Sequence, residues 1–162
     1  MLTQARLKEV LHYETKTGIF TYLLSRRTTI IGTVAGTIWD GYRWIYVEGK
    51  RFSAHRLAWL YVYGEWPKQQ TDHINGIRDD NRIENLRDVS VNVNQQNVRH
   101  GKSDNTSGYL GVSKYKNIKA KPWRAQIIIN GRMTHLGYFE TPELAHAAYV
   151  KAKRIHHIGC TI

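Results

Sequence analysis

A nine-residue stretch without a large apolar side chain divides this chain into two parts that can each build a core. Residues 99–107 read RHGKSDNTS, whereas apolar residues recur on both sides of them. Small and polar residues at this density are typical of a linker. A chain of 162 residues has room for one ordinary domain or two small ones. We therefore predict a first domain over residues 1–98, a linker over 99–107 and a second domain over 108–162.

The first part is expected to mix short helices with short strands. Apolar residues at helical spacing predict a helix over residues 3–12, and GIFTYLL predicts a strand over 18–24. Two extended runs flank Glu48-Gly49, which indicates a hairpin between them.

A second, more apolar helix is predicted over residues 54–63. Ser53 stands where an N-cap is expected, and Gly64 marks the end of the helix. Trp44 and Tyr46 lie in the strand region before it, and we assign both to the core rather than to a stacking surface.

The second part predicts three strands followed by one helix, so that the whole chain belongs to the α+β class. The expected strands cover residues 108–115, 122–131 and 133–139. Asn130-Gly131 is a strong hairpin turn, and Thr141-Pro142 opens a helix with Thr as its cap. The side chains expected to form the buried stripe of that helix are Leu144, Ala145, Ala148, Tyr149, Ala152 and Ile155.

The chain is strongly basic, with 24 Lys and Arg against 13 Asp and Glu and a formal net charge of +11. Residues 98–162 hold 11 of these basic residues and only 3 of the acidic ones. Such a balance favours a polyanionic partner, and nucleic acid comes first. A mildly basic domain without that function is the alternative.

The cysteine and hydropathy patterns bear on the cellular location of the protein. Cys160 is the single cysteine, which excludes an internal disulfide and a thiolate zinc cluster. No apolar run approaches the ~18 residues of a membrane-spanning helix, and the N-terminus lacks a signal-peptide core. We therefore expect a cytoplasmic location and no membrane partner.

Residues 68–97 lose apolar side chains and gain Asp, Asn and His. TDHINGIRDDNRIENL indicates two short strands around a polar loop, and a helix is expected from Ser90. Asp72 offers a carboxylate for a hard divalent cation, and His73 can take a proton from water near neutral pH. Strand neighbours point to opposite faces, so both can serve one site only where the strand ends or bends. Isolated Asp–His pairs are usually ordinary surface residues, so the pair alone does not identify a site.

The order DHINGIRDDNRIENL, followed by SVNVNQQN, resembles the motif of HNH endonucleases from phages and intron-encoded homing enzymes. The resemblance covers about residues 55–97. It implies that residues of about 68–98 fold as a ββα-metal unit, with sheet and helix elements on its N-terminal side.

The resemblance also implies a role for four residues. Asp72 corresponds to the carboxylate metal ligand, and His73 to the general base that activates water. Asn85 corresponds to the central asparagine that braces the loop and orients the base. Asn94 corresponds to the metal ligand on the helix, where many relatives have His. The implied reaction is phosphodiester hydrolysis with one divalent ion, Mg²⁺ first and Mn²⁺ as the alternative.

Three more residues are weighed as metal or phosphate contacts. Asn97 lies one helical turn beyond Asn94, so it can face the same site. His55 is interpreted as structural first, and Arg56 beside it as a phosphate contact.

The second part resembles the plant APETALA/ethylene-response-factor DNA-binding domain, which also occurs fused to phage HNH nucleases. The matching stretches are GYLGVSKYKN, PWRAQIIINGRMTHLGYF and TPELAHAAYVKA, marked by YxGV, WxAxI, LGxF and an Ala-rich helix. The resemblance implies a sheet that lies in the major groove of double-stranded DNA with the helix behind it.

Alternation along WRAQIII separates two faces of the central strand. Arg124 and Gln126 share one face and Trp123 lies on the other, although alternation does not say which face meets DNA. The resemblance implies that Arg124 and Gln126 contact the DNA bases. Lys119 and Lys121 are expected to contact phosphates. Further candidates on the flanking strands are Ser113, Lys114, Lys116, Arg132 and His135.

The leading hypothesis is a DNA endonuclease, homing-type or phage-encoded, that nicks or cuts duplex DNA in a bacterial host. A non-catalytic DNA-binding regulator and a structured-RNA binder are the alternatives. A regulator would tend to lose Asp72, His73 or Asn94, and all three are present. The target site and the oligomeric state stay open, with a monomer favoured over an oligomer.

Overall fold

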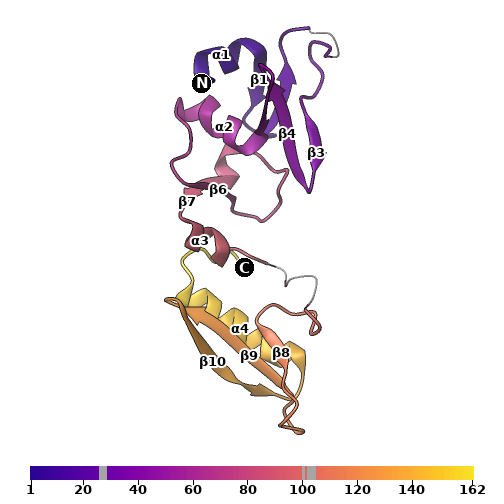
Figure 1. The fold of residues 1–162 in the computed structure, drawn as a ribbon, viewed down its shortest axis with the longest axis vertical. Coiled ribbons are helices and arrows are strands. Elements are labelled where there is room, and N and C mark those ends of the chain that lie inside the picture. The colour runs from indigo at the N-terminus through magenta and orange to yellow at the C-terminus, as the bar shows by residue number, and fades with distance from the viewer. Residues whose placement is uncertain (26–28, 100, 102–104) are drawn as a thin grey trace. The chain divides into compact units, whose positions relative to one another are not determined.

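The computed structural model describes most of the chain, namely residues 1–25, 29–99, 101 and 105–162. Part of the predicted linker, residues 100 and 102–104, lies outside the described residues. The described chain forms two compact units, Met1–Val91 and Asn92–Ile162. Both mix helices with small antiparallel sheets, which confirms the predicted combination of elements (Figure 1). The predicted domain limits stay a prediction.

The first unit has a helix and a hairpin, then a three-stranded sheet, a second helix and a two-stranded sheet. In chain order its elements are α1 (Gln4–Val10), β1 (Leu11–Glu14), β2 (Ile19–Tyr22), β3 (Thr37–Trp39), β4 (Tyr42–Val47), β5 (Lys50–Ser53), α2 (Ala54–Tyr63), β6 (Gln70–His73), the 3-10 helix η1 (Ile83–Asn85) and β7 (Leu86–Val89). Its sheets are β1–β2, β3–β4–β5 and β6–β7, and every pairing is antiparallel.

The core of this unit is formed by α1, α2 and the inward faces of β1, β2 and β4. Ile45 and Val47 of β4 are buried there, as period-2 alternation requires. The same alternation turns Tyr46 outward, and 65 % of its surface is exposed. Trp44 is half-buried beneath the guanidinium of Arg51, 4.4 Å from the ring centroid. The assignment of Tyr46 to the core was therefore wrong.

Hairpin turns in both units form where the sequence predicts them. Glu48 and Gly49 have φ angles of 51° and 76°, and Asn130 and Gly131 have 50° and 77°. Two consecutive positive φ angles match the turn whose twist suits a hairpin. These turns join β4 to β5 in the first unit and β9 to β10 in the second.

The second unit consists of a three-stranded sheet backed by one long helix, preceded by a short helix. Its elements are α3 (Val91–Gln96, which starts at the unit boundary), β8 (Val112–Lys114), β9 (Trp123–Ile129), β10 (Arg132–Phe139) and α4 (Pro142–His156). The strand order is β8–β9–β10, and α4 packs against all three strands. Thr141 caps α4 by accepting a hydrogen bond from the backbone N of Leu144, as predicted.

The buried face of α4 differs from the predicted stripe at its edges. Ala145, Tyr149 and Ala152 are buried as expected, but Leu144 is 52 % exposed and Ile155 is 67 % exposed. Lys153 is buried instead, with only 1 % of its surface exposed. Its Nζ donates a hydrogen bond to the carbonyl of Val98. A lysine stem can line an apolar face when its ammonium group finds an acceptor.

Candidate functional site

The antiparallel pair β6–β7 brings Asp72 and His73 into a buried position in the first unit. Asp72 lies opposite Arg87, whose Nε and Nη2 donate to the same carboxylate oxygen, Oδ2, at 2.9 and 2.7 Å. Strand β6 ends at His73, and the backbone N of Gly76 donates to the His73 carbonyl at 2.9 Å. The chain therefore turns directly after His73, which is the strand end that a shared site requires.

His73 is 4 % exposed and packs against two rings of the same unit. Its ring centroid lies 5.2 Å from that of His55 and 6.0 Å from that of Tyr42. Its Nε2 atom lies 3.2 Å from Oδ1 of Asn81. Burial lowers the pKa of His73 from its usual value, although the Asn81 contact and the Asp72 carboxylate act in the opposite direction. His73 is therefore held as a neutral imidazole, the form that can accept a proton.

His55 lies at the start of α2, where Nε2 is 3.2 Å from the hydroxyl of Ser53. This contact replaces the predicted cap, because the Ser53 side chain makes no capping hydrogen bond. Burial, followed by the charges of His73 and Arg56, lowers the pKa of His55 to about 3. His55 is therefore an uncharged ring that packs against His73. Arg56 is exposed, with its guanidinium 5.7 Å from the Trp66 ring centroid; phosphate or metal contact by either residue stays a prediction.

Asn85 braces the loop that connects β6 to η1. Its Nδ2 donates to Oδ1 of Asn75 at 3.0 Å and to the carbonyl of Asp80 at 2.8 Å, and its Oδ1 accepts from the backbone N of Asn75 at 3.0 Å. Its own carbonyl accepts from the backbone N of Ile74 at 2.8 Å. These bonds fix the backbone on both sides of the turn after His73; the role of Asn85 in orienting the base stays a prediction.

The acidic part of this loop is also held by ion pairs. Asp80 accepts from Arg82 at 2.7 and 2.8 Å and from Nδ2 of Asn75 at 2.6 Å. The Arg82 hydrogen bond, followed by that of Asn75, keeps the pKa of Asp80 at about 2. Asp79 pairs with Arg43 of β4 at 2.9 and 3.0 Å. These residues were not predicted from the sequence, although the run of charged and amide side chains in DDNR indicated a loop held by polar contacts.

Two predicted ligands belong to the second unit: Asn94 lies in α3, and Asn97 follows directly after its end. Asn94 is half-buried, and its carbonyl accepts from the backbone N of Asn97 at 3.0 Å. Asn97 is 6 % exposed, and its Oδ1 accepts from the hydroxyl of Thr161 near the C-terminus. Their roles as metal ligands stay predictions.

A metal ion in the first unit would be held by few protein groups. Across the described ranges, no group of three His, Cys, Asp or Glu side chains is arranged to hold an ion. Asp72 offers carboxyl oxygens here, and the adjacent loop carries the amide oxygens of Asn75 and Asn85. This hard-oxygen chemistry fits Mg²⁺ or Mn²⁺, whose remaining positions water and phosphate oxygens can fill.

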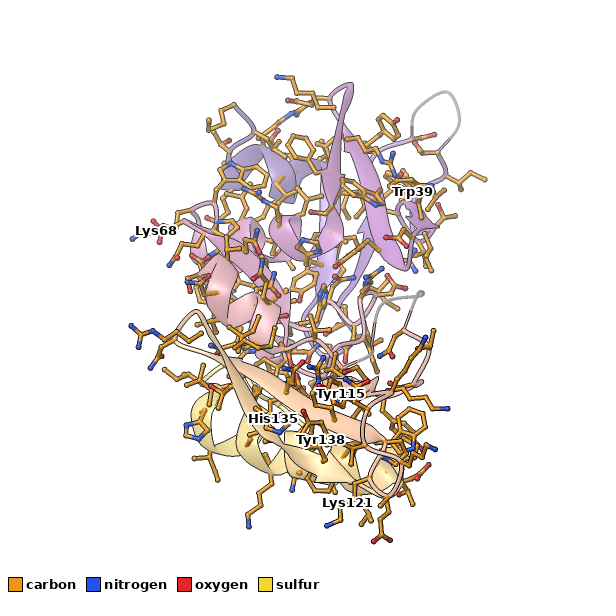
Figure 2. The ribbon with its side chains drawn as sticks, turned by 60° about the horizontal axis from the view of Figure 1, so that its bottom comes forward. Trp39, Lys68, Tyr115, Lys121, His135 and Tyr138 are labelled. Atoms are coloured by element: carbon orange, nitrogen blue, oxygen red, sulfur yellow. The ribbon has the colours of Figure 1, made fainter. Side chains whose placement is uncertain are left out.

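The outer face of the second unit's sheet carries a connected polar and aromatic surface. Arg124 lies opposite Ser113, with Nη2 3.3 Å from its hydroxyl, and its guanidinium is 5.5 Å from the Tyr115 ring centroid. Tyr138 lies 5.1 Å from Tyr115 and 4.6 Å from His135, between ring centroids. Figure 2 shows Tyr115, His135 and Tyr138 together over this sheet. We call this the outer sheet face; in β9 it alternates with the buried residues that face α4.

Strand register separates the other predicted DNA contacts. Gln126 pairs with His135 on the outer sheet face. Lys114 lies opposite Trp123, and Arg132 lies opposite Ile129. Both basic residues therefore belong to the face of the sheet that α4 covers, and not to the outer sheet face. The exposed lysines of the β8–β9 connection are Lys116, Lys119 and Lys121.

One comparison with known proteins covers the segment that contains these residues. Residues 52–96 match the family model for HNH endonucleases. The matched segment starts in β5 and ends with α3, so it includes His55, Asp72, His73, Asn81 and Asn85. At the level of the family, this supports an HNH-type nuclease, a phosphodiester hydrolase that acts on DNA. No curated protein and no solved structure matches the chain.

A bilayer-spanning segment is not found among the helices of the described ranges. The longest of them, α4, has 15 residues and carries several charged side chains.

Proposed function

We propose that this chain is a metal-dependent DNA endonuclease of the HNH type, and that its basic C-terminal module holds it on duplex DNA. The observation that carries the proposal is His73, a buried imidazole at the end of β6 beside Asp72, within the segment that matches HNH endonucleases. The proposal includes a phage or homing-type origin and activity in a bacterial cytoplasm.

In the proposed reaction, His73 takes the proton from the water that attacks phosphorus. Asn85 keeps the loop after His73 in one conformation, so that the imidazole does not have to be ordered during the reaction. Asp72 would hold a divalent cation, Mg²⁺ first and Mn²⁺ as the alternative, and the role of Asn94 as a further ligand stays a prediction. Such a cation supplies charge stabilisation at the phosphate and at the leaving 3′ oxygen.

The C-terminal module is proposed to dock on duplex DNA through the outer sheet face. Arg124, Gln126 and His135 stand on that face and can reach base edges, while Lys119 and Lys121 can neutralise phosphates from the neighbouring loop. This proposal is supported by the sequence resemblance and by the excess of basic residues in this part of the chain.

Supercoiled plasmid tests the proposed function directly. The purified chain is incubated with plasmid and Mg²⁺, Mn²⁺ or a chelator, and the products are separated on an agarose gel. Nicked or linear DNA that forms only with a divalent ion is the expected result. Plasmid that is bound but stays supercoiled with every ion would contradict the proposal and favour the non-catalytic DNA-binding regulator.

A further inference from the structure

Asn81 is a buried loop residue that faces the proposed general base. It lies in the connection between β6 and η1, and only 1 % of its surface is exposed. Its Oδ1 is 3.2 Å from Nε2 of His73. A buried amide in hydrogen-bond contact with an imidazole can fix which ring nitrogen carries the proton.

The orientation of the Asn81 amide follows from its other neighbour. Nδ2 lies 3.1 Å from the carbonyl oxygen of Asp79 and 3.4 Å from its carboxylate. Both oxygens are acceptors, so the amide NH₂ group must face Asp79 and the amide oxygen must face His73. A flipped amide would place acceptor against acceptor at Asp79 and would lose both hydrogen bonds.

The protonation of His73 then follows. Because the Asn81 oxygen can only accept, Nε2 of His73 must donate to it and must carry the proton. In a neutral imidazole, the lone pair then lies on Nδ1. We propose that Asn81 is a positioning residue, which holds His73 in the Nε2–H tautomer and makes Nδ1 the atom that takes the proton from water. This inference rests on the proposed function, because it assumes that His73 is the base.

The first hairpin of the chain holds Asn81 in place. The hydroxyl of Tyr13 in β1 donates to the Asn81 carbonyl at 2.7 Å. Gly18, with φ of +73°, lies so close that a Cβ atom there would be 2.5 Å from the Asn81 carbonyl carbon and 2.4 Å from the Arg82 nitrogen. Only glycine permits this approach and this φ. The β1–β2 hairpin therefore acts on His73 through Asn81, although it is more than fifty residues away in the sequence.

A spectroscopic measurement on the full chain tests the tautomer itself. Nitrogen-15 NMR distinguishes protonated from unprotonated ring nitrogens, and the His73 signals are assigned by their loss in His73→Gln. At a pH where the ring is neutral, we expect a protonated Nε2 and an unprotonated Nδ1. A His73 ring protonated on Nδ1 would overturn the inference, whatever the behaviour of any variant.

Two substitutions separate the hydrogen bond from the packing of the loop. Asn81→Leu removes the acceptor, and we expect a loss of about 10–100-fold in kcat with little change in KM. Asn81→Gln keeps both an amide oxygen for Nε2–H and an NH₂ group for Asp79, so it should recover part of that loss and retain the tautomer. Gln69→Leu removes an exposed amide next to β6 and should cut like the parent protein. Thermal unfolding of each variant shows that the compared proteins are folded.

The outcomes distinguish this inference from the proposed function. A parent protein that cuts no DNA would overturn the proposed function, and the catalytic purpose of Asn81 with it. A parent protein that cuts, with folded Asn81→Leu cutting equally fast, would overturn the inference alone. If neither Asn81 variant folds, the tautomer of the parent protein decides.

Discussion

The loop around His73 and the outer sheet face use polar side chains in opposite ways. In the loop, His73, Asn81 and Asn85 are each at most 6 % exposed, and hydrogen bonds join them to side chains and backbone of the same loop. On the sheet, His135 is exposed and Arg124 is half-buried, and their neighbours are rings and a hydroxyl. A buried network holds groups at fixed positions, as chemistry requires, whereas an exposed face leaves its cations accessible to a polyanion.

The largest effect that this comparison predicts comes from His73→Ala. Loss of a positioned general base typically lowers the rate by about 10²–10⁴-fold. Cutting should fall by that factor, while DNA affinity measured by fluorescence anisotropy stays at the parent value, since binding belongs to the sheet. His12→Ala, at an exposed position in β1, is the control. Cutting by His73→Ala at the parent rate would remove the distinction between a catalytic loop and a binding sheet.

The buried loop also predicts a pH-dependent stability of the first unit. Burial lowers the pKa of His55 to about 3, against 6.5 for the ordinary group, and lowers that of His73 as well. Below pH 6.5 the unfolded chain takes up protons that the folded chain cannot, so this stabilisation is complete above 6.5 and is lost as the pH falls toward 3. The free energy of unfolding should decline by up to about 1.4 kcal/mol per pH unit for each histidine.

Denaturant unfolding at a series of pH values measures this slope. His55→Gln should make it shallower, and His12→Gln should leave it unchanged. If the free energy of unfolding depends on pH in the same way in the parent and in His55→Gln, burial does not lower the pKa of His55, and the contrast with the exposed sheet fails at this residue.

The exposed lysines next to the outer sheet face predict a salt effect on binding. Changing Lys116, Lys119 and Lys121 to Ala should weaken DNA binding, because fewer counterions are released. The slope of log K against log salt should become less steep by about 0.9 for each phosphate that the variant no longer neutralises. Binding titrations at several salt concentrations provide the slope, and single-turnover cutting at saturating DNA should be unchanged.

A charge-matched variant sharpens that measurement. Replacing Lys16, Lys50 and Lys68 of the first unit by Ala removes the same number of charges from a different part of the chain. We expect a smaller change of slope there. An equal change would mean that binding depends on the total charge and not on the C-terminal module.

The smallest expected effect concerns the helix behind the sheet. Thr141→Ala removes the cap of α4, and the loss of such a cap typically costs ~1 kcal/mol. Thermal unfolding should show this loss for the second unit, and Thr141→Ser should restore it. Cutting at saturating DNA should not change, because α4 supports the DNA-binding face and does not contact the proposed general base, His73. A large loss of cutting in folded Thr141→Ala would break the separation of the two roles.

Sequence reasoning reached the principal elements of this site but not all of its contacts. It predicted the strands around Asp72 and His73, because these depend on short patterns of residue types, whereas the role of Asn85 came only from the resemblance to HNH endonucleases. It did not identify Asn81, since an asparagine in a polar loop is usually a turn residue. Nor did it place His55 beside His73, because nothing in the spacing of the two residues indicates that their rings are 5.2 Å apart.

The sequence by itself determined the features that near neighbours control. The turns at Glu48-Gly49 and Asn130-Gly131 and the Thr141 cap form as predicted, because each depends on the conformational preferences of adjacent residues. Only the tertiary structure decided that Lys153 is buried while Leu144 is exposed, and that Asn81 turns its oxygen toward His73. These outcomes depend on which distant groups fill the surrounding space and which acceptors they offer, and local preference carries no information about either.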